Sequence, residues 1–180
     1  INGGAITDSN TLTVSGASSF TMDANNNAIT LDTGALAGTI TVSTAGTNNF
    51  TLDNGSTAVD LGTVGVTGAL SVTSGGEITD SGVITVAGAA AFETDADNVN
   101  IVLDTTTNAI TGALTFTTTA GSTSADITLN NGATAISLAS FLAKGNLTLT
   151  STAAIDVQAH TVNGNLTVTS GGAITQTGAL

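Results

Sequence analysis

The sequence predicts an all-β fold: a parallel β-helix (β-solenoid) of about eight coils, with three short strands in each coil. Three observations favour it. A seventeen-residue pattern recurs at matching offsets, apolar residues alternate with Thr, Ser, Asp and Asn at period two, and the composition suits short strands joined by tight turns. The chain has 180 residues with 22 Gly, no Pro, no Trp and only 3% aromatics. Val, Leu, Ile and Ala must therefore fill the core.

The repeated unit occupies 58–74, 135–151 and 154–170, and 28–44 follows the same plan. Apolar residues take the second and fourth places of each unit and two places after its glycine. In the first copy these are Val59, Leu61, Leu70 and Val72. Alternation at period two places them on one side of each strand and the polar residues on the other.

Gly68, Gly145 and Gly164 hold one equivalent position between the apolar pairs. Glycine takes a positive φ without a steric penalty. We therefore expect these three residues to turn the corners of the coil through a positive φ.

A longer repeat lies over the short one. Residues 3–33 return at 75–105, an offset of 72 (75 − 3), and 50–61 returns at 127–138, an offset of 77 (127 − 50). The GGxIT element appears a third time 96 residues later (171 − 75), and 96 equals 77 plus 19, the spacing between the last two short units. A closed sandwich does not readily accept such an extra copy of its strands, whereas a solenoid does. We therefore expect 1–180 to be one continuous solenoid segment of a longer repeat protein, with superrepeats at 3–74 and 75–170 and a third beginning at 171.

About two dozen strands are expected, among them 11–15, 19–23, 39–44, 49–53, 83–87, 113–117 and 126–130. The residues gained in the second superrepeat lie around 105–107 and 120–124. Gly, Thr and Ser there predict loops at coil corners.

The charge balance excludes several partners. One Lys faces 13 acidic residues, there is no Arg, and the net charge is −12. Nucleic acid binding needs Lys and Arg to displace counterions, and an anionic membrane surface repels such a chain. No apolar run is long enough to cross a bilayer, and the absence of Cys rules out disulfides and thiolate chemistry.

The runs GALSVTSGGEIT (68–79) and GNLTVTSGGAIT (164–175) resemble the repeats of filamentous haemagglutinin-type exoproteins and related giant bacterial surface adhesins. The resemblance covers nearly the whole chain. It implies a right-handed parallel β-helix and a secreted or cell-surface bacterial protein. The coils here vary in length, and the secretion element and cell-binding module of that family do not occur in these residues.

A calcium site is the single cofactor candidate. Two loops at equivalent positions, 72 residues apart, carry alternating oxygen side chains that suit Ca²⁺: the first has Asp23, Asn25 and Asn27, and the second has Asp95, Asp97 and Asn98. Neither loop has the central Gly or the distal Glu of an EF-hand, and tight turns also favour Asn and Asp. No catalytic or cofactor-binding residue is assigned.

Other conspicuous residues have structural interpretations. His160 takes the place of Val64 and Phe141 in the aligned units, and Lys144 precedes a turn glycine. Asp8 and Asp80 recur with the superrepeat, as turn residues do, so an enzyme is not expected.

Two surface features stay open. Outward threonines, such as Thr148 with Thr150 and Thr167 with Thr169, form an array that Ala69 and Asn146 interrupt, so ice binding is not favoured. The four Asn-x-Ser/Thr sequences arise readily in a Thr-rich repeat and are not assigned as glycosylation sites; they begin at Asn49, Asn54, Asn146 and Asn165.

The expected function is that of a structural segment of an extracellular repeat protein, forming a rigid rod, filament or matrix fibre. The alternative is an adhesive module that recognises carbohydrate or a surface through a lateral face. The expected partners are further repeats of the same chain or other copies stacked end to end, together with surface glycans in the adhesive case.

Overall fold

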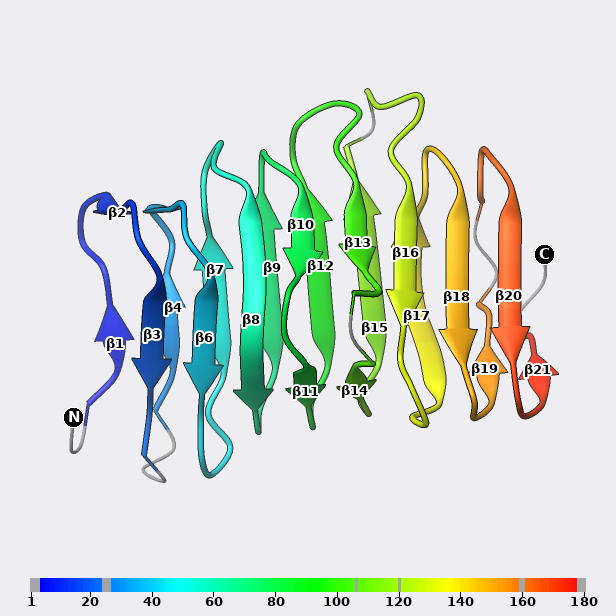
Figure 1. The fold of residues 1–180 in the computed structure, drawn as a ribbon, viewed down its shortest axis with the longest axis horizontal. Helices are drawn as coiled ribbons and strands as arrows, with labels where there is room; N and C mark the ends of the chain where they lie inside the picture. The colour runs from blue at the N-terminus through cyan, green and yellow to red at the C-terminus, as the bar shows by residue number, and fades with distance from the viewer. Residues whose placement is uncertain (1–3, 24–26, 106, 120, 159–160, 178–180) are drawn as a thin grey trace.

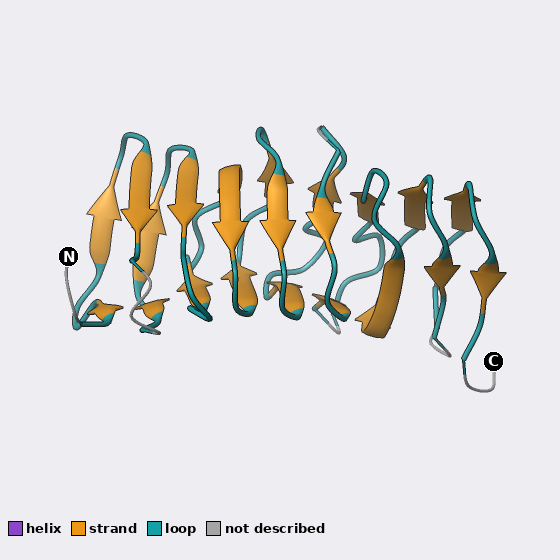
Figure 2. Ribbon diagram, turned by 90° about the horizontal axis from the view of Figure 1, so that it is seen from below, coloured by secondary structure: helices purple, strands orange, loops and turns teal. Residues whose placement is uncertain are grey.

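The computed structural model describes residues 4–23, 27–105, 107–119, 121–158 and 161–177, and these contain strands and no helix. All strand pairs among them are parallel. The chain winds coil after coil along one axis, with its two ends at opposite ends of the stack (Figures 1 and 2). The predicted β-solenoid is confirmed.

Each coil places one strand segment on each of three faces. The first face carries the second part of β17 and six further strands: β1 (Ile6–Thr7), β4 (Ile29–Leu31), β7 (Phe50–Asp53), β9 (Leu70–Ser74), β12 (Ala90–Thr94) and β15 (Leu114–Thr118). An isolated bridge from Ala143 to Val162 continues this face.

The second face carries the first part of β8 (Val59–Val66) and seven further strands: β2 (Leu12–Val14), β5 (Gly34–Leu36), β10 (Ile78–Asp80), β13 (Ile101–Leu103), β16 (Ile127–Asn130), β18 (Leu147–Ser151) and β20 (Leu166–Ser170). The third face carries the second part of β8, the first part of β17 (Ile136–Leu142) and six further strands: β3 (Ser18–Thr21), β6 (Ile40–Ser43), β11 (Ile84–Val86), β14 (Ala109–Ile110), β19 (Ile155–Asp156) and β21 (Ile174–Thr175). Strands β8 and β17 are long because each runs around a corner without a break. The seven strands named individually from the sequence are all present, within one or two residues of their expected bounds.

The coil is right-handed. In Figure 1 the nearer strands, such as β6 and β8, run downward, the farther strands, such as β9 and β12, run upward, and the chain advances from left to right. The handedness implied by the family resemblance is therefore correct.

Inward side chains stack in continuous rows. One row on the first face runs through Leu31, Leu52, Val72, Phe92, Phe116 and Phe141. Each of these residues is buried, and the rings of Phe92 and Phe116 stack with centroids 5.6 Å apart. Stacking of like residues in register fills this part of the interior, and a second aromatic pair, Phe20 and Phe50, packs with ring centroids 6.1 Å apart. The buried aliphatic residues form one core cluster along the axis.

The expectation of a positive φ at Gly68, Gly145 and Gly164 is wrong. Among the described glycines, positive φ occurs at Gly46, Gly55 and Gly132. A Cβ at Gly164 would lie 2.7 Å from both Asn146 Oδ1 and Gly145 O, and a Cβ at Gly68 or Gly145 would likewise collide with the preceding coil. Glycine is needed at these corners because successive coils approach too closely for a side chain.

Each superrepeat begins one face further round than the last. The GGxIT element leads into β1 on the first face, β10 on the second and β21 on the third. The first step, of 72 residues, spans three coils plus one strand segment, and the second step, of 96 residues, spans four coils plus one strand segment. The extra coil inferred from the spacing is present, and equivalent residues of successive superrepeats do not stack on one another.

Candidate functional site

A break in the second face borders a cleft. Strand β5 pairs with β2 in a separate two-stranded sheet and has no strand partner on its other side. The side chain of Asn54 fills that place: Leu36 N donates to Asn54 Oδ1 at 2.8 Å, and Asn54 Nδ2 donates to Leu36 O at 3.0 Å. A buried amide thus substitutes for one residue of a β-ladder, and the turn after it bends away from β5.

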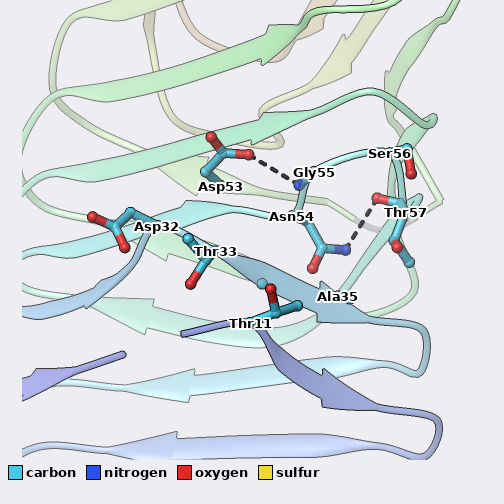
Figure 3. A pocket seen from close by; sticks show the side chains of 10 residues that line it. Thr11, Asp32, Thr33, Ala35, Asp53, Asn54, Gly55, Ser56 and Thr57 are labelled. Carbon is cyan, nitrogen blue, oxygen red and sulfur yellow. Dashed lines mark hydrogen bonds between the residues drawn. The ribbon is translucent and has the colours of Figure 1, made fainter. Parts of the chain in front are cut away.

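The turn 54–57 and β5 enclose a cleft of about 370 Å³ (Figure 3). Asn54 Nδ2 also donates to Thr57 O at 3.0 Å, and Asp53 Oδ1 accepts from Gly55 N at 2.9 Å, which fixes the shape of the turn. Gly55 has a φ of 54°, so a side chain there would be strained. The residues lining the cleft are Thr11, Asp32, Thr33, Gly34, Ala35, Asp53, Asn54, Gly55, Ser56 and Thr57.

The lining of the cleft suits a ligand that forms hydrogen bonds and is uncharged or positively charged. Its wall offers two carboxylates, Asp32 and Asp53, with hydroxyl groups from Thr and Ser and the methyl groups of Thr and Ala35. No basic residue lines it, so an anionic ligand would be repelled. Carboxylates beside small apolar surfaces suit the hydroxyl groups and C–H faces of a neutral sugar.

A second feature is the open cross-section of the last coil. Leu166 is 50% exposed and Ile174 is 58% exposed, although each ends an inward row whose preceding members are fully buried. Together with Val157 and Val168 they border a hollow of about 220 Å³. This surface is apolar because it has the composition of the core.

The two candidate calcium loops lie at different corners of the coil. Asp23 and Asn27 flank a corner between β3 and β4, and Asn25 lies outside the described residues. Asp95 and Asp97 lie at a different corner, between β12 and β13. No group of three or more acidic, His or Cys side chains suited to a metal ion occurs in the part of the chain that the structure describes.

Asp8 follows strand β1 as a turn residue, whereas Asp80 is the buried last residue of β10. Asp8 Oδ2 accepts from Thr33 N at 3.0 Å, and Asp80 Oδ1 accepts from Thr105 N at 3.0 Å, so each carboxylate holds the residue 25 positions later. Desolvation tends to raise the pKa of Asp8, but hydrogen bonds from the backbone of Asp32 and from Thr33 outweigh it, so the pKa is lowered.

Lys144 lies directly before the corner glycine and its N donates to Thr118 Oγ1 at 3.3 Å. His160 lies outside the described residues. The outward threonines of β18 and β20 face one another in register, Thr148 beside Thr167 and Thr150 beside Thr169.

Three of the four Asn-x-Ser/Thr asparagines, Asn49, Asn54 and Asn146, form side-chain hydrogen bonds to the backbone of an adjacent coil. Asn54 is fully buried, so it is inaccessible to glycosylation in the folded protein. The side chains of Asn49 and Asn146 accept from the backbone of the next coil, at Ala69 N (2.8 Å) and Asn165 N (2.9 Å). Sequence reasoning missed these roles; the signal that could have found them is the recurrence of Asn54 as Asn131, 77 positions later.

A further site missed from the sequence is Asn98. It has a φ of 59°, and its Oδ1 accepts from Thr123 N at 2.9 Å and Ser124 N at 3.2 Å, as well as from both hydroxyls. One side chain thereby joins the loop between β12 and β13 to the loop between β15 and β16 in the next coil.

Comparison with known proteins shows that the chain matches a family of repeats. The profile of a family described as repeats of unknown function (DUF5649) matches residues 1–45, 47–117 and 144–180. No curated protein and no solved structure matches the chain. Among the described residues, no helix is long and apolar enough to cross a membrane.

Proposed function

Because the chain belongs to the family of repeats of unknown function (DUF5649) and folds as a β-solenoid, we propose that it is a structural segment of an extracellular repeat protein, a rod that sets distance rather than performing catalysis. The observation that carries this proposal is the uninterrupted core. Rows of aliphatic side chains continue from coil to coil, and the extra coil of the second superrepeat extends them without disturbing its neighbours.

A spacer should change length in proportion to its coils. Duplication of 75–170 adds four coils and one strand segment, and should lengthen the particle by about 20 Å at ~4.8 Å per coil. Deletion of one nineteen-residue coil, such as 136–154, should shorten it by one step. Cryo-electron microscopy of the variants measures both; a second separate unit in place of a longer stack would contradict the proposal.

The resemblance of 68–79 and 164–175 to filamentous haemagglutinin-type repeats supports a secreted or cell-surface bacterial location. The strongly acidic surface also favours solubility of a long rod. Antibodies against the folded chain should label intact cells of the source organism. Labelling only after permeabilisation would overturn the extracellular part of the proposal.

A second candidate function is carbohydrate recognition, favoured by the cleft beside β5. Its size of about 370 Å³ fits one or two sugar rings, and its carboxylates and hydroxyls favour a neutral glycan. The test is a glycan array read with the native chain and with the double variant Asp32→Ala, Asp53→Asn. Asp104→Asn, which changes an exposed acid outside the cleft, is the control. Loss of binding in the double variant, with binding kept in the control, supports carbohydrate recognition by the cleft. If the native chain binds no neutral glycan on the array, this candidate function is excluded.

A further inference from the structure

Two Asn-Gly pairs place a chemically reactive sequence inside the core. Asn54 precedes Gly55, and Asn131 precedes Gly132. An asparagine followed by glycine deamidates faster than other asparagines, because a residue without Cβ lets its backbone nitrogen approach the side-chain amide. Both asparagines are nevertheless 0% exposed. The sequence of each pair favours the reaction, whereas its position in the fold opposes it.

The side-chain amide of Asn54 is held on both of its polar atoms. Its Oδ1 accepts from Leu36 N at 2.8 Å, and its Nδ2 donates to the carbonyl oxygens of Leu36, Thr57 and Ala58 at 3.0, 3.0 and 3.2 Å (Figure 3). Deamidation requires Cγ to move onto the nitrogen of the next residue. That movement breaks buried hydrogen bonds and leaves their partners unpaired.

The amide of Asn131 is held in the same way. Its Oδ1 accepts from Ile110 N at 2.8 Å, and its Nδ2 donates to the carbonyl oxygens of Ile110, Thr134 and Ala135 at 2.9, 3.2 and 3.1 Å. The two turns, 54–57 and 131–134, therefore protect their asparagines by one mechanism.

The nitrogen that would attack is engaged as well. Gly55 N donates to Asp53 Oδ1 at 2.9 Å, and Gly132 N donates to Asn130 Oδ1 at 3.1 Å. This nitrogen must lose its proton before it can react. A hydrogen bond to the protonated form disfavours that loss.

Each turn can open without unfolding the whole stack. Gly55, Ser56 and Ala133 are exposed, and the buried asparagine is the residue that ties its turn to the preceding coil. Coils of a solenoid contact only their neighbours, and local opening costs less than global unfolding. The two turns, 77 positions apart (131 − 54), should therefore open independently.

We propose that Asn54 and Asn131 are deamidation sites that react only while their own turn is open. In the open turn, the nitrogen of the following glycine loses its proton to solvent and bonds to Cγ. The bond from Cγ to the amide nitrogen breaks, and ammonia leaves, so that a succinimide ring remains. One water molecule then opens the ring to aspartate or isoaspartate. Water is the single co-reactant, and nothing is oxidised or reduced.

The product does not fit the closed turn. A carboxylate at position 54 would face the carbonyl oxygens of Leu36, Thr57 and Ala58 without the Nδ2 protons that now separate them. A buried charge without a partner is strongly unfavourable. Isoaspartate also inserts an extra carbon into the backbone of the turn. Deamidation thereby converts a transient opening of one coil into a lasting weak point.

A urea series on the native chain tests this route. The chain is incubated at pH 8.5 and 37 °C, in urea concentrations below its unfolding transition and in one above it. Pepsin digestion in acid, followed by mass spectrometry, then measures the fraction deamidated at each asparagine. Hydrogen exchange at the Leu36 and Ile110 amides, which donate to the two Oδ1 atoms, measures opening in the same solutions.

Both sites should react more slowly in the native chain than in the unfolded chain, on the order of a hundredfold or more. As urea rises, deamidation of Asn54 should accelerate in parallel with exchange at Leu36, and deamidation of Asn131 in parallel with exchange at Ile110. Equal rates in the folded and unfolded chain would overturn the proposal. So would a rate at Asn54 that stays constant while exchange at Leu36 accelerates.

Paired variants test whether the turns open separately. Asp53→Ala and Asn130→Ala each remove the acceptor for one glycine N–H. Each should accelerate deamidation at its own site about fivefold or more and leave the other site unchanged. Thr51→Ala, at an outward position on β7, is the control and should change neither rate.

Equal acceleration of both sites by either variant would show that the reaction proceeds through global unfolding, and would overturn local opening. Circular dichroism establishes that each variant is folded. The urea series uses the native chain, so it decides the proposal even where a variant fails to fold.

Discussion

The side-chain amide of Asn54 forms with Leu36 the two hydrogen bonds that a neighbouring strand would otherwise form. The same arrangement recurs one superrepeat later, where Ile110 N donates to Asn131 Oδ1 at 2.8 Å and Asn131 Nδ2 donates to Ile110 O at 2.9 Å. Both asparagines precede a glycine with positive φ, Gly55 and Gly132. The superrepeat therefore conserves a substitute for a β-bridge, although the strand it serves lies on the second face in one copy and on the third in the other.

Asn54→Asp should destabilise the fold by about 3 kcal/mol or more. The substitution removes the Nδ2 donor from three carbonyl groups, those of Leu36, Thr57 and Ala58, and places a carboxylate against them in a fully buried position. Urea unfolding at neutral pH measures the change. Asn49→Asp is the matched control, since Asn49 is exposed and only accepts a hydrogen bond, and it should change stability by less than ~1 kcal/mol. Equal losses in the two variants would contradict the assigned role.

Gly145→Ala should destabilise the protein by about 1–3 kcal/mol through overpacking, even though its φ is not positive. The new Cβ would lie 2.8 Å from Ala125 O, a backbone atom that cannot move aside alone. Gly4→Ala, which meets nothing within 4 Å, is the control and should be neutral or slightly stabilising. Thermal melting of both variants at low protein concentration distinguishes close approach from backbone strain as the reason for the glycine.

Asn98 contributes to stability by adopting a positive φ without much strain and by accepting hydrogen bonds from Thr123 and Ser124, and substitutions should separate these two effects. Asn98→Gly keeps the φ of 59° but loses the four hydrogen bonds to Thr123 and Ser124, and we expect a loss of about 1–2 kcal/mol. Asn98→Ala adds strain of roughly 1 kcal/mol to that loss. Asn98→Asp keeps the acceptor oxygen and should remain within ~1 kcal/mol of the native protein. Hydrogen exchange at the Thr123 amide provides the local measurement, and an unchanged exchange rate in Asn98→Gly would disprove the coupling of the two loops.

Acid should loosen the first coil through Asp8. Since the folded pKa of Asp8 lies below its unfolded value, ionised Asp8 stabilises the fold above the unfolded pKa of about 3.9. The contribution is lost as the pH falls through the lowered folded pKa. The difference in melting temperature between the native chain and Asp8→Asn should therefore shrink below pH 4, together with protection of the Thr33 amide. A difference that stays constant between pH 6 and pH 2 would rule out this source of acid sensitivity.

Much of the architecture follows from alternation along the sequence. Residues such as Leu70 and Val72, or Leu147 and Leu149, are predicted to point inward by period two alone, and all four are buried. Period two does not reveal where a strand turns a corner without a break. The sequence pattern does not distinguish β8 or β17 from a pair of short strands. Residues at their corners, such as Gly62, also suit a turn.

The candidate sites were less accessible to sequence reasoning. Asn54 lies in an Asn-Gly-Ser run, which indicates a turn or a glycosylation sequence, and only the three-dimensional position of β5 shows that its amide completes a ladder. The cleft exists because that ladder lacks a strand, and a missing partner leaves no pattern in the residues that border it. Conversely, the interpretation as a turn residue is correct for Asp8, which follows β1, and wrong for Asp80, which is the buried last residue of β10; both carboxylates nevertheless accept a backbone N–H 25 positions later.

The advance of one face per superrepeat governs how a long array of such units meets its surroundings. The three copies of the GGxIT element already lead into strands on three different faces, about a third of a revolution apart. In a longer array with the same step, each of the three faces carries the same repeated element once in every three superrepeats. A rod of this kind therefore presents the element in every direction around its axis, even when one face rests against another surface.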